Sequence, residues 1–332
     1  MKEVADEQLA CAAARAGMSY PFAVWNFGDS VYVDALVELS EVTGDREFAG
    51  FAYGMVKAWI AHTGYDLVDH TAPGAAIIEL CHRTGDRQLL DAAVRLAQLW
   101  ERFPRAATAE AYLHTPQRHL NVPIDCVHFD GPFFAKLAAA TGEDRYAHRA
   151  VYELSWRLAL LQDEESGLCD HSYLSGPGRR GGVMWGRGQG WALLGLVETL
   201  RVLPAETDGW GTLHERLRRL VGGLIATQDP SGHWHTVVDD VESYLETSVA
   251  AFFVAAVARG LDAGLLDESA VAQALGAAWE ATRAAAGADG VLNGVSAETP
   301  TTLSPAAYRR VPVGGTHPWG QGPLALAALS HR

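Results

Sequence analysis

The sequence predicts an all-α fold, a closed (α/α)6 barrel of six helical hairpins in a single domain over residues 1–332. Three observations support this fold class. Nearly apolar segments with a helical pattern alternate with amphipathic ones along the chain. A tight-turn motif recurs between such segments. No Pro- or Ser-rich linker divides the chain, which favours one domain.

The recurring motif predicts short turns inside helical hairpins. Each copy has a leucine, three further residues, a threonine, a glycine and an acidic residue. Glycine ends a helix well because it adopts the left-handed conformation without penalty, and the acidic residue can cap the next helix. The copies are Leu39-x3-Thr43-Gly44-Asp45, Leu80-x3-Thr84-Gly85-Asp86 and Leu137-x3-Thr141-Gly142-Glu143.

The apolar segments are expected to form the inner ring, because helices that are apolar all round are buried. They lie near 28–42, 72–83, 125–140, 187–202, 243–263 and 319–330. The amphipathic segments have solvated stripes and should form the outer ring. They lie near 4–17, 46–62, 87–102, 144–162, 211–227 and 268–286. The strand signal is weak and is best over 232–238.

Long connections lead into the inner helices and should form one face of the barrel, its mouth. They span 103–124, 163–186, 228–242 and 287–318. Long loops on one face usually carry function, and the inner helices would point their partly positive N-termini there. The mouth is therefore a predicted anion site. At one entrance, Ser243-x-x-Glu246 fits a capping box, which indicates a structural role for Glu246.

Aspartates at the helix entrances are candidate acids. Asp125 precedes an apolar helix, and Asp69 stands before Pro73-Gly74. A carboxyl group partly buried among aromatic side chains can stay protonated and act as an acid. An aspartate before a helix can also simply cap it. Both interpretations stay open, and so does the choice between Asp125 and Asp130 as the acid.

The stretch from Trp185 to Trp191 opens another inner helix. Arg187 and Trp191 are four residues apart and share a helical face. Arg187 either forms a salt bridge to a neighbouring helix or is a fixed cation for an anionic ligand. The three glycines are expected to let a sugar ring approach the backbone. His171 lies in a long loop and is either an ordinary surface residue or a ligand-binding group.

The composition excludes several classes of function. A net charge of −14 argues against nucleic-acid binding, and no apolar run is long enough for a membrane span. The first residues do not have a signal-peptide pattern, so we expect a cytoplasmic protein. Four scattered cysteines fit reduced thiols. His233-x-His235 lacks a third ligand at a convincing spacing, so no metal is expected. Ten tryptophans favour a site that stacks sugar rings.

Several motifs together resemble a known family. They are Trp185 to Trp191, Asp69-His70-Thr71-Ala72-Pro73-Gly74, Asp125 with Gly131-Pro132-Phe133-Phe134, Leu168-Cys169-Asp170-His171, Gly232-His233-Trp234 and Ser243 to Ser248. In this order they are similar to the unsaturated rhamnogalacturonyl and uronyl hydrolases of glycoside hydrolase family 105 and the related family 88. The resemblance implies the same (α/α)6 barrel.

The resemblance also implies a reaction. These enzymes remove the 4,5-unsaturated uronic acid that polysaccharide lyases leave at the non-reducing end of an oligosaccharide. An aspartic acid protonates C4, water adds at C5, and the resulting hemiketal opens and releases the neighbouring sugar. The implied partner is a small anionic oligosaccharide, no metal or organic cofactor is implied, and a monomer and a homo-oligomer are both open.

The implied roles follow the matching residues. Asp125 would be the general acid and base, and Asp69 would be the second carboxylate. His171, Arg187 and Trp191 would bind the unsaturated ring. The other expected substrate-binding residues are Trp185, Trp25, His128, Trp234 and Trp319.

Two alternative functions remain. Another (α/α)6 sugar enzyme, an epimerase or isomerase, would use a pair of histidines drawn from His128, His171, His233, His235 and His317. A non-catalytic glycan-binding barrel would keep the aromatic residues without the acid. The joint presence of Asp69, Asp125, His171 and Arg187 favours the hydrolase. The leaving sugar is not determined by the sequence.

Overall fold

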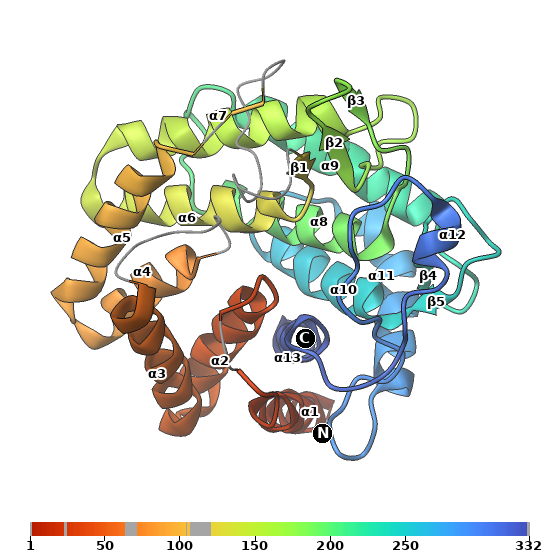
Figure 1. Ribbon diagram of the computed structural model, residues 1–332. Coiled ribbons are helices and arrows are strands. Elements are labelled where there is room, and N and C mark those ends of the chain that lie inside the picture. Colours follow the sequence, from red (N-terminus) through yellow and green to blue (C-terminus); the bar gives the residue numbers. More distant parts are fainter. Residues whose placement is uncertain (1, 23–24, 64–71, 104, 107–120, 331–332) are drawn as a thin grey trace.

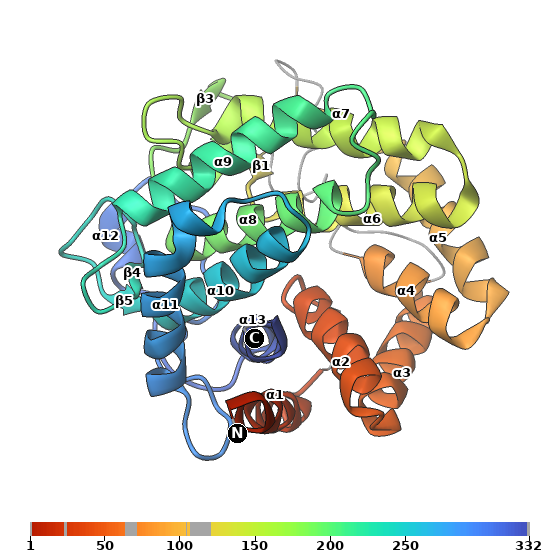
Figure 2. The same cartoon turned by 180° about the vertical axis from the view of Figure 1, so that it is seen from behind.

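The computed structural model describes residues 2–22, 25–63, 72–103, 105–106 and 121–330, and it confirms the predicted fold class. Within these residues, six inner helices contact one another in a closed ring, seen from opposite sides in Figures 1 and 2. They are α2 (Asp29–Thr43), α4 (Gly74–Thr84), α6 (Cys126–Thr141), α8 (Gly186–Leu200), α10 (Thr247–Asp262) and α13 (Pro318–Ser330).

The predicted outer helices are also confirmed, and each packs against an inner helix. They are α1 (Lys2–Met18), α3 (Arg46–Thr63), α5 (Arg87–Trp100), α7 (Asp144–Leu161), α9 (Trp210–Ala226) and α11 (Glu268–Ala285). The later five each follow their inner partner in the sequence. By contrast, α1 packs against α13, so the first helix of the chain completes the last hairpin (Figure 1).

The recurring turn motif works through its glycine and its threonine. Gly44, Gly85 and Gly142 have φ angles of 72°, 71° and 70°, and each N–H donates to the carbonyl four residues earlier. The threonine hydroxyl donates to the carbonyl of the motif's leucine and accepts from the N–H of its acidic residue. The hydroxyl therefore links the last turn of one helix to the start of the next.

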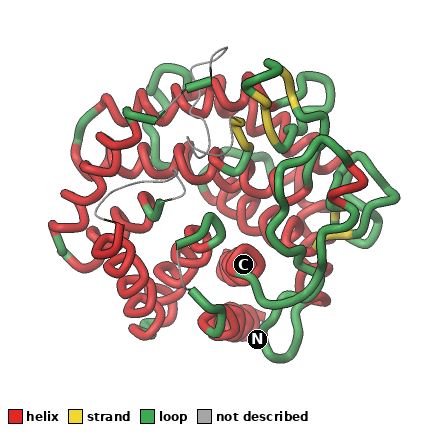
Figure 3. Tube along the Cα trace, viewed as in Figure 1, coloured by secondary structure: helices red, strands yellow, loops and turns green. Residues whose placement is uncertain are grey.

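Short strands join the long loops of the mouth. β1 (Asn121–Pro123), β2 (Ser172–Leu174) and β3 (Arg179–Arg180) form one antiparallel sheet in that order, and β4 (Trp234–His235) pairs with β5 (Leu245–Glu246). β4 confirms the strand predicted over 232–238. β1 to β3 and the one-turn helix α12 (Pro305–Tyr308) lie where the sequence predicts only loops. Figure 3 shows long green loops gathered around these strands.

The predicted capping box at Ser243 is wrong, because α10 begins only at Thr247. The Ser243 hydroxyl instead donates to the Asp240 carbonyl within the loop. Glu246 ends β5 and is fully buried, and its carboxylate accepts hydrogen bonds from Arg187 and from the Ser248 hydroxyl. Glu246 occupies the N-cap position of α10 without a side-chain capping hydrogen bond, so it serves the structure through its ion pair with Arg187.

In the described part of the chain, no helix is both long enough and apolar enough to cross a membrane.

Gly142→Ala is expected to lower the free energy of unfolding by about 1–2 kcal/mol, because a side chain is disfavoured in the left-handed region. No atom lies within 4 Å of the added Cβ, so the effect is one of backbone conformation. Gly50→Ala is the matched control. Gly50 is exposed inside α3 with the same open space, and its replacement should raise the free energy by about 0.5–1 kcal/mol. Urea unfolding measures both variants, and changes of the same sign would contradict this account.

Candidate active site

Asp125 and His171 come together because β1 and β2 pair. The register places Pro123 opposite Ser172, and the Ile124 N–H donates to the His171 carbonyl at 2.9 Å. Asp125 follows at once as the N-cap residue of α6. Its Oδ2 lies 3.6 Å from Nε2 of His171. This pair therefore depends on strands that sequence reasoning missed.

The Asp125 carboxyl group does not cap α6, so the capping alternative does not describe it. It makes no capping hydrogen bond to α6, and 13% of its side-chain surface is exposed. Asp130 differs, because it is fully buried in an ion pair with Arg157 at 2.5 Å. Arg157 also donates to the Pro123 carbonyl, so this pair anchors the end of β1. Asp69 lies outside the described residues.

His171 is a buried residue of the mouth, so the surface alternative does not describe it. Its ring packs against the Trp185 ring, with centroids 4.3 Å apart and planes tilted by 33°. Its Nδ1 lies 2.5 Å from the Tyr308 hydroxyl, while Nε2 faces Asp125. Tyr308 belongs to α12, and the sequence carries no signal that would have brought it to this site. Segments far apart in the chain therefore meet at one imidazole.

Gln189 fixes the loop that carries His171. Its side-chain oxygen accepts from the Cys169 N–H at 2.8 Å, and its amide nitrogen donates to the Cys169 carbonyl at 2.6 Å. The amide also donates to the Trp185 carbonyl at 3.0 Å. This fully buried side chain therefore holds the backbone two residues before His171.

The glycines of the 185–191 stretch face protein rather than a ligand, which corrects the expectation that a sugar ring approaches them. An added Cβ would lie 2.7 Å from a neighbouring segment in each case: from the His235 carbonyl oxygen at Gly186, from Ile124 at Gly188 and from Phe252 at Gly190. The glycines thus let α8 pack closely against β4, against the residue before Asp125 and against α10.

Arg187 is fully buried, and the protein itself holds its guanidinium. The two terminal nitrogens donate to Glu246 Oε1, to the carbonyl and hydroxyl of Ser296, to the Ala297 carbonyl and to the Thr299 hydroxyl, at 2.7–3.2 Å. Arg187 therefore forms a salt bridge, as one of its two predicted alternatives states, and it also donates to further oxygen acceptors. Of the three guanidinium nitrogens, Nε is the one that has no hydrogen-bond partner among the described residues.

Three of the predicted tryptophans lie close to Arg187 or to His128. The Arg187 guanidinium lies over the Trp185 and Trp319 rings, 4.7 and 5.5 Å from their centroids. Trp191 contacts the His128 ring with centroids 5.0 Å apart. Two of these rings therefore flank the buried cation, and the third packs against His128.

The other predicted tryptophans lie differently. The Trp234 indole N–H donates to the Leu224 carbonyl of α9 at 2.8 Å, and its ring packs on Phe253 of α10. Trp234 is therefore part of the packing between α9 and α10, and we remove it from the substrate-binding set. Trp25 is half-buried and packs against the core.

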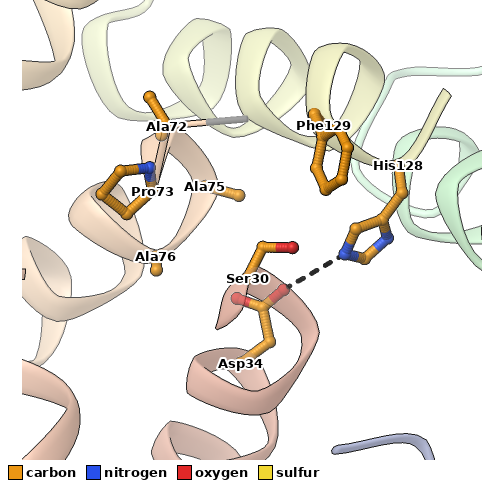
Figure 4. A pocket seen from close by; sticks show the side chains of 9 residues that line it. Ser30, Asp34, Ala72, Pro73, Ala75, Ala76, His128 and Phe129 are labelled. Carbon is orange, nitrogen blue, oxygen red and sulfur yellow. Dashed lines mark ion pairs between the residues drawn. The ribbon is translucent and has the colours of Figure 1, made fainter. Parts of the chain in front are cut away.

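A pocket between α2, α4 and α6 contains His128 (Figure 4). Its Nε2 lies 3.9 Å from Oδ2 of Asp34. Burial lowers the pKa of His128 to about 4 and raises the pKa of Asp34 to about 6. His128 is therefore neutral at pH 7, and a neutral imidazole can bind a hydroxyl group. The pocket is also lined by Ser30, Ala72, Pro73, Gly74, Ala75, Ala76 and Phe129.

A metal site finds no support in the described part of the chain, where no group of three or more His, Cys, Asp or Glu side chains could hold an ion. His235, considered above as a possible ligand, instead lies with Nδ1 2.5 Å from the Ser243 carbonyl oxygen.

Comparisons with known proteins identify relatives along the whole chain. Residues 1–332 match the family described as Glycosyl Hydrolase Family 88. The chain is 26% identical over 321 residues to the unsaturated rhamnogalacturonyl hydrolase YesR of Bacillus subtilis, which covers 92% of this chain and 89% of that protein.

Solved structures show the same fold. A possible member of family GH105 from Salmonella enterica superposes with a TM-score of 0.89 at 19% identity, over 99% of this chain and 93% of the other. A family 105 glycoside hydrolase of C. acetobutylicum superposes with a TM-score of 0.87 at 23% identity, over 98% of both chains.

Asp130→Asn is expected to lower the free energy of unfolding by about 3–5 kcal/mol, because it leaves the buried Arg157 guanidinium without its counter-charge. Asp130→Leu combined with Arg157→Met removes both charges and should restore most of the loss. Urea unfolding of the single variant, the double variant and the wild-type protein measures these changes in the free energy of unfolding. A single variant as stable as the wild type would show that Asp130 is not an anchor.

Proposed function

The chain belongs to Glycosyl Hydrolase Family 88, and we propose on that basis that it removes a 4,5-unsaturated uronic acid from the non-reducing end of oligosaccharides produced by polysaccharide lyases. The Bacillus subtilis relative, which matches nearly the whole chain, is named an unsaturated rhamnogalacturonyl hydrolase. An unsaturated galacturonyl-rhamnose disaccharide is therefore the first substrate to test.

The pairing of Asp125 with His171 is the observation that carries the proposal. The Asp125 carboxyl group is partly exposed, makes no capping hydrogen bond and lies 3.6 Å from the imidazole. The hydration of a vinyl ether needs an acid to protonate carbon and then a base to activate water, and one carboxyl group can perform both steps in turn. The environment of Asp125 suits both proposed roles, first as the acid and then as the base.

In the proposed reaction, the Asp125 carboxyl group gives its proton to C4 of the unsaturated ring, and positive charge develops at C5 and the ring oxygen. Water adds at C5 and returns a proton to the Asp125 carboxylate. The hemiketal formed at C5 opens when its bond to the ring oxygen breaks and the C5 hydroxyl proton passes to that oxygen, which leaves a ketone at C5 and a hemiacetal at C1. The hemiacetal then collapses to an aldehyde, and the neighbouring sugar departs from C1 as an alcohol. The proton spent in the first step is restored in the second.

Groups around the pair suit an anionic sugar. The N-termini of α6 and α8 supply partial positive charge. Among the described residues, the indole N–H groups of Trp185 and Trp191 and the Nε–H of Arg187 have no hydrogen-bond partner. We propose that these donors and the neutral His128 bind the carboxylate and hydroxyl groups of the substrate. In this scheme the positive charge of the buried Arg187 guanidinium attracts the anionic substrate mainly from within the protein.

The alternatives are less favoured. A sugar epimerase or isomerase would need a pair of histidines that gain and lose protons near neutral pH. Burial lowers the pKa of His128 to about 4 and holds the pKa values of His233 and His317 below the usual value. A glycan-binding barrel would have no use for a carboxyl group set against an imidazole. The match to a hydrolase family over the whole chain points the same way.

We expect the protein to consume unsaturated galacturonyl-rhamnose in a panel of unsaturated disaccharides. Loss of the ultraviolet absorbance of the C4=C5 bond measures turnover. The panel also contains unsaturated glucuronyl disaccharides from ulvan and gellan-like chains and glycosaminoglycan fragments. Turnover of only these other members would show that the leaving sugar is not rhamnose. If the folded protein turned over no member of the panel, the proposed reaction would be refuted.

Asp125→Asn should lower kcat at least about 100-fold, because an amide cannot protonate carbon. Binding of the disaccharide, measured by calorimetry, and urea stability should stay near wild type. Asp144→Asn is the matched control, since Asp144 is an exposed aspartate at the start of α7, at the far end of the same hairpin, and this variant should remain active. Near wild-type turnover by Asp125→Asn would move the acid role to Asp69.

A further inference from the structure

We propose that Tyr308 is a positioning residue that holds His171 in the tautomer with its proton on Nε2, so that this N–H points at Asp125. Tyr308 lies on α12, in the connection between α11 and α13, and its hydroxyl is 2.5 Å from Nδ1 of His171. The inference deepens the proposed function and rests on it, because it explains how the environment of the proposed acid is set.

The Tyr308 hydroxyl has one proton and two acceptors near it. Nδ1 of His171 lies at 2.5 Å, and the Thr302 carbonyl oxygen lies at 3.4 Å. The proton forms the stronger hydrogen bond in the shorter contact. The Thr302 N–H, 3.5 Å away, approaches the hydroxyl oxygen as a donor. Tyr308 therefore donates to Nδ1, and Nδ1 carries no proton.

The other ring nitrogen supports the same tautomer. Nε2 lies 3.6 Å from Oδ2 of Asp125. A lone pair on Nε2 would repel the carboxylate that Asp125 becomes once it has given its proton to the substrate, whereas an N–H attracts it. The imidazole is also held in its orientation, because it is buried, packs against the tilted Trp185 ring at 4.3 Å and meets the Tyr308 ring edge-on at 5.6 Å. Both nitrogens therefore place the proton on Nε2.

Tyr308 is itself fixed by contacts that lead back to Arg187. The segment 295–308, here called the strap, carries Tyr308 at its end. Arg187 donates to the strap at Ser296, Ala297 and Thr299. The Trp319 indole N–H donates to the Ser296 carbonyl at 2.9 Å. Since the Tyr308 side chain is fully buried, the anchored strap places its hydroxyl against His171.

This N–H has a defined use in the proposed reaction. When Asp125 gives its proton to the substrate, the resulting carboxylate gains a hydrogen-bond donor at Oδ2. Catalytic hydrogen bonds are often long without substrate and shorten in the complex, so the 3.6 Å separation is compatible with this use. The opposite tautomer would present a lone pair to the carboxylate and would oppose proton transfer.

Nitrogen-15 NMR of the histidine-labelled protein tests the tautomer directly. The His171→Gln variant identifies the His171 signals by their loss. We expect the Nε2 signal of a protonated nitrogen and the Nδ1 signal of an unprotonated one in the wild-type protein. Protonation on Nδ1 would overturn the inference. This measurement needs no substrate and no Tyr308 variant, so it remains decisive even if the proposed substrate is wrong.

Tyr308→Phe keeps the ring and removes the hydroxyl. We expect the two His171 nitrogen signals to move towards a tautomer average, kcat on the unsaturated disaccharide to fall about 10-fold, and KM to change less than about twofold. Tyr32→Phe is the matched control, because it removes another buried hydroxyl, which donates to the Ala14 carbonyl. It should lower stability while the His171 signals and kcat stay unchanged. Unchanged His171 signals in Tyr308→Phe, or equal changes in both variants, would overturn the inference.

Discussion

The buried positive charge of Arg187 is the constraint on which the rest of the mouth depends. A guanidinium removed from water is costly unless its charge and its N–H groups are matched. Glu246 supplies the counter-charge, and the strap supplies carbonyl and hydroxyl acceptors from residues 109–112 positions further along the chain. Because one side chain must satisfy all these contacts at once, the start of α8, the end of β5 and the strap have a single mutual arrangement.

The stretch from Trp185 to Trp191 therefore builds the framework of the site, while the proposed reacting groups come from other segments. Its glycines allow close packing, Gln189 holds the loop before His171, and Arg187 holds the strap. Asp125 and His171 enter on β1 and β2. A motif shared with a family of enzymes can thus be a framework for catalytic residues rather than a set of them.

The helices were predictable because each has a long periodic pattern, and because Thr-Gly turns such as Thr84-Gly85 have a local cause. Asp125 and His171 could be selected as residue types at helix entrances and loops. Their pairing could not, since strands of three residues carry little periodicity and pair across a long separation. The hydrogen-bond acceptors of Arg187 and Trp234 could not be predicted either. The sequence identifies the donor side chain but not the carbonyl groups that the fold places beside it.

The pairing of α1 with α13 also bears on how the barrel assembles. Gln321 of α13 donates to the Ala13 carbonyl of α1 at 3.0 Å, across 308 residues. A ribosome releases α1 before α13, so the alanine-rich face of α1 stays without this partner until the helices between them have been made. Contacts of such long range are slow to form. A circular permutant, with α13 joined to α1 and new ends opened at a Thr-Gly turn, would make this hairpin a neighbour contact and shift the late step to another part of the ring.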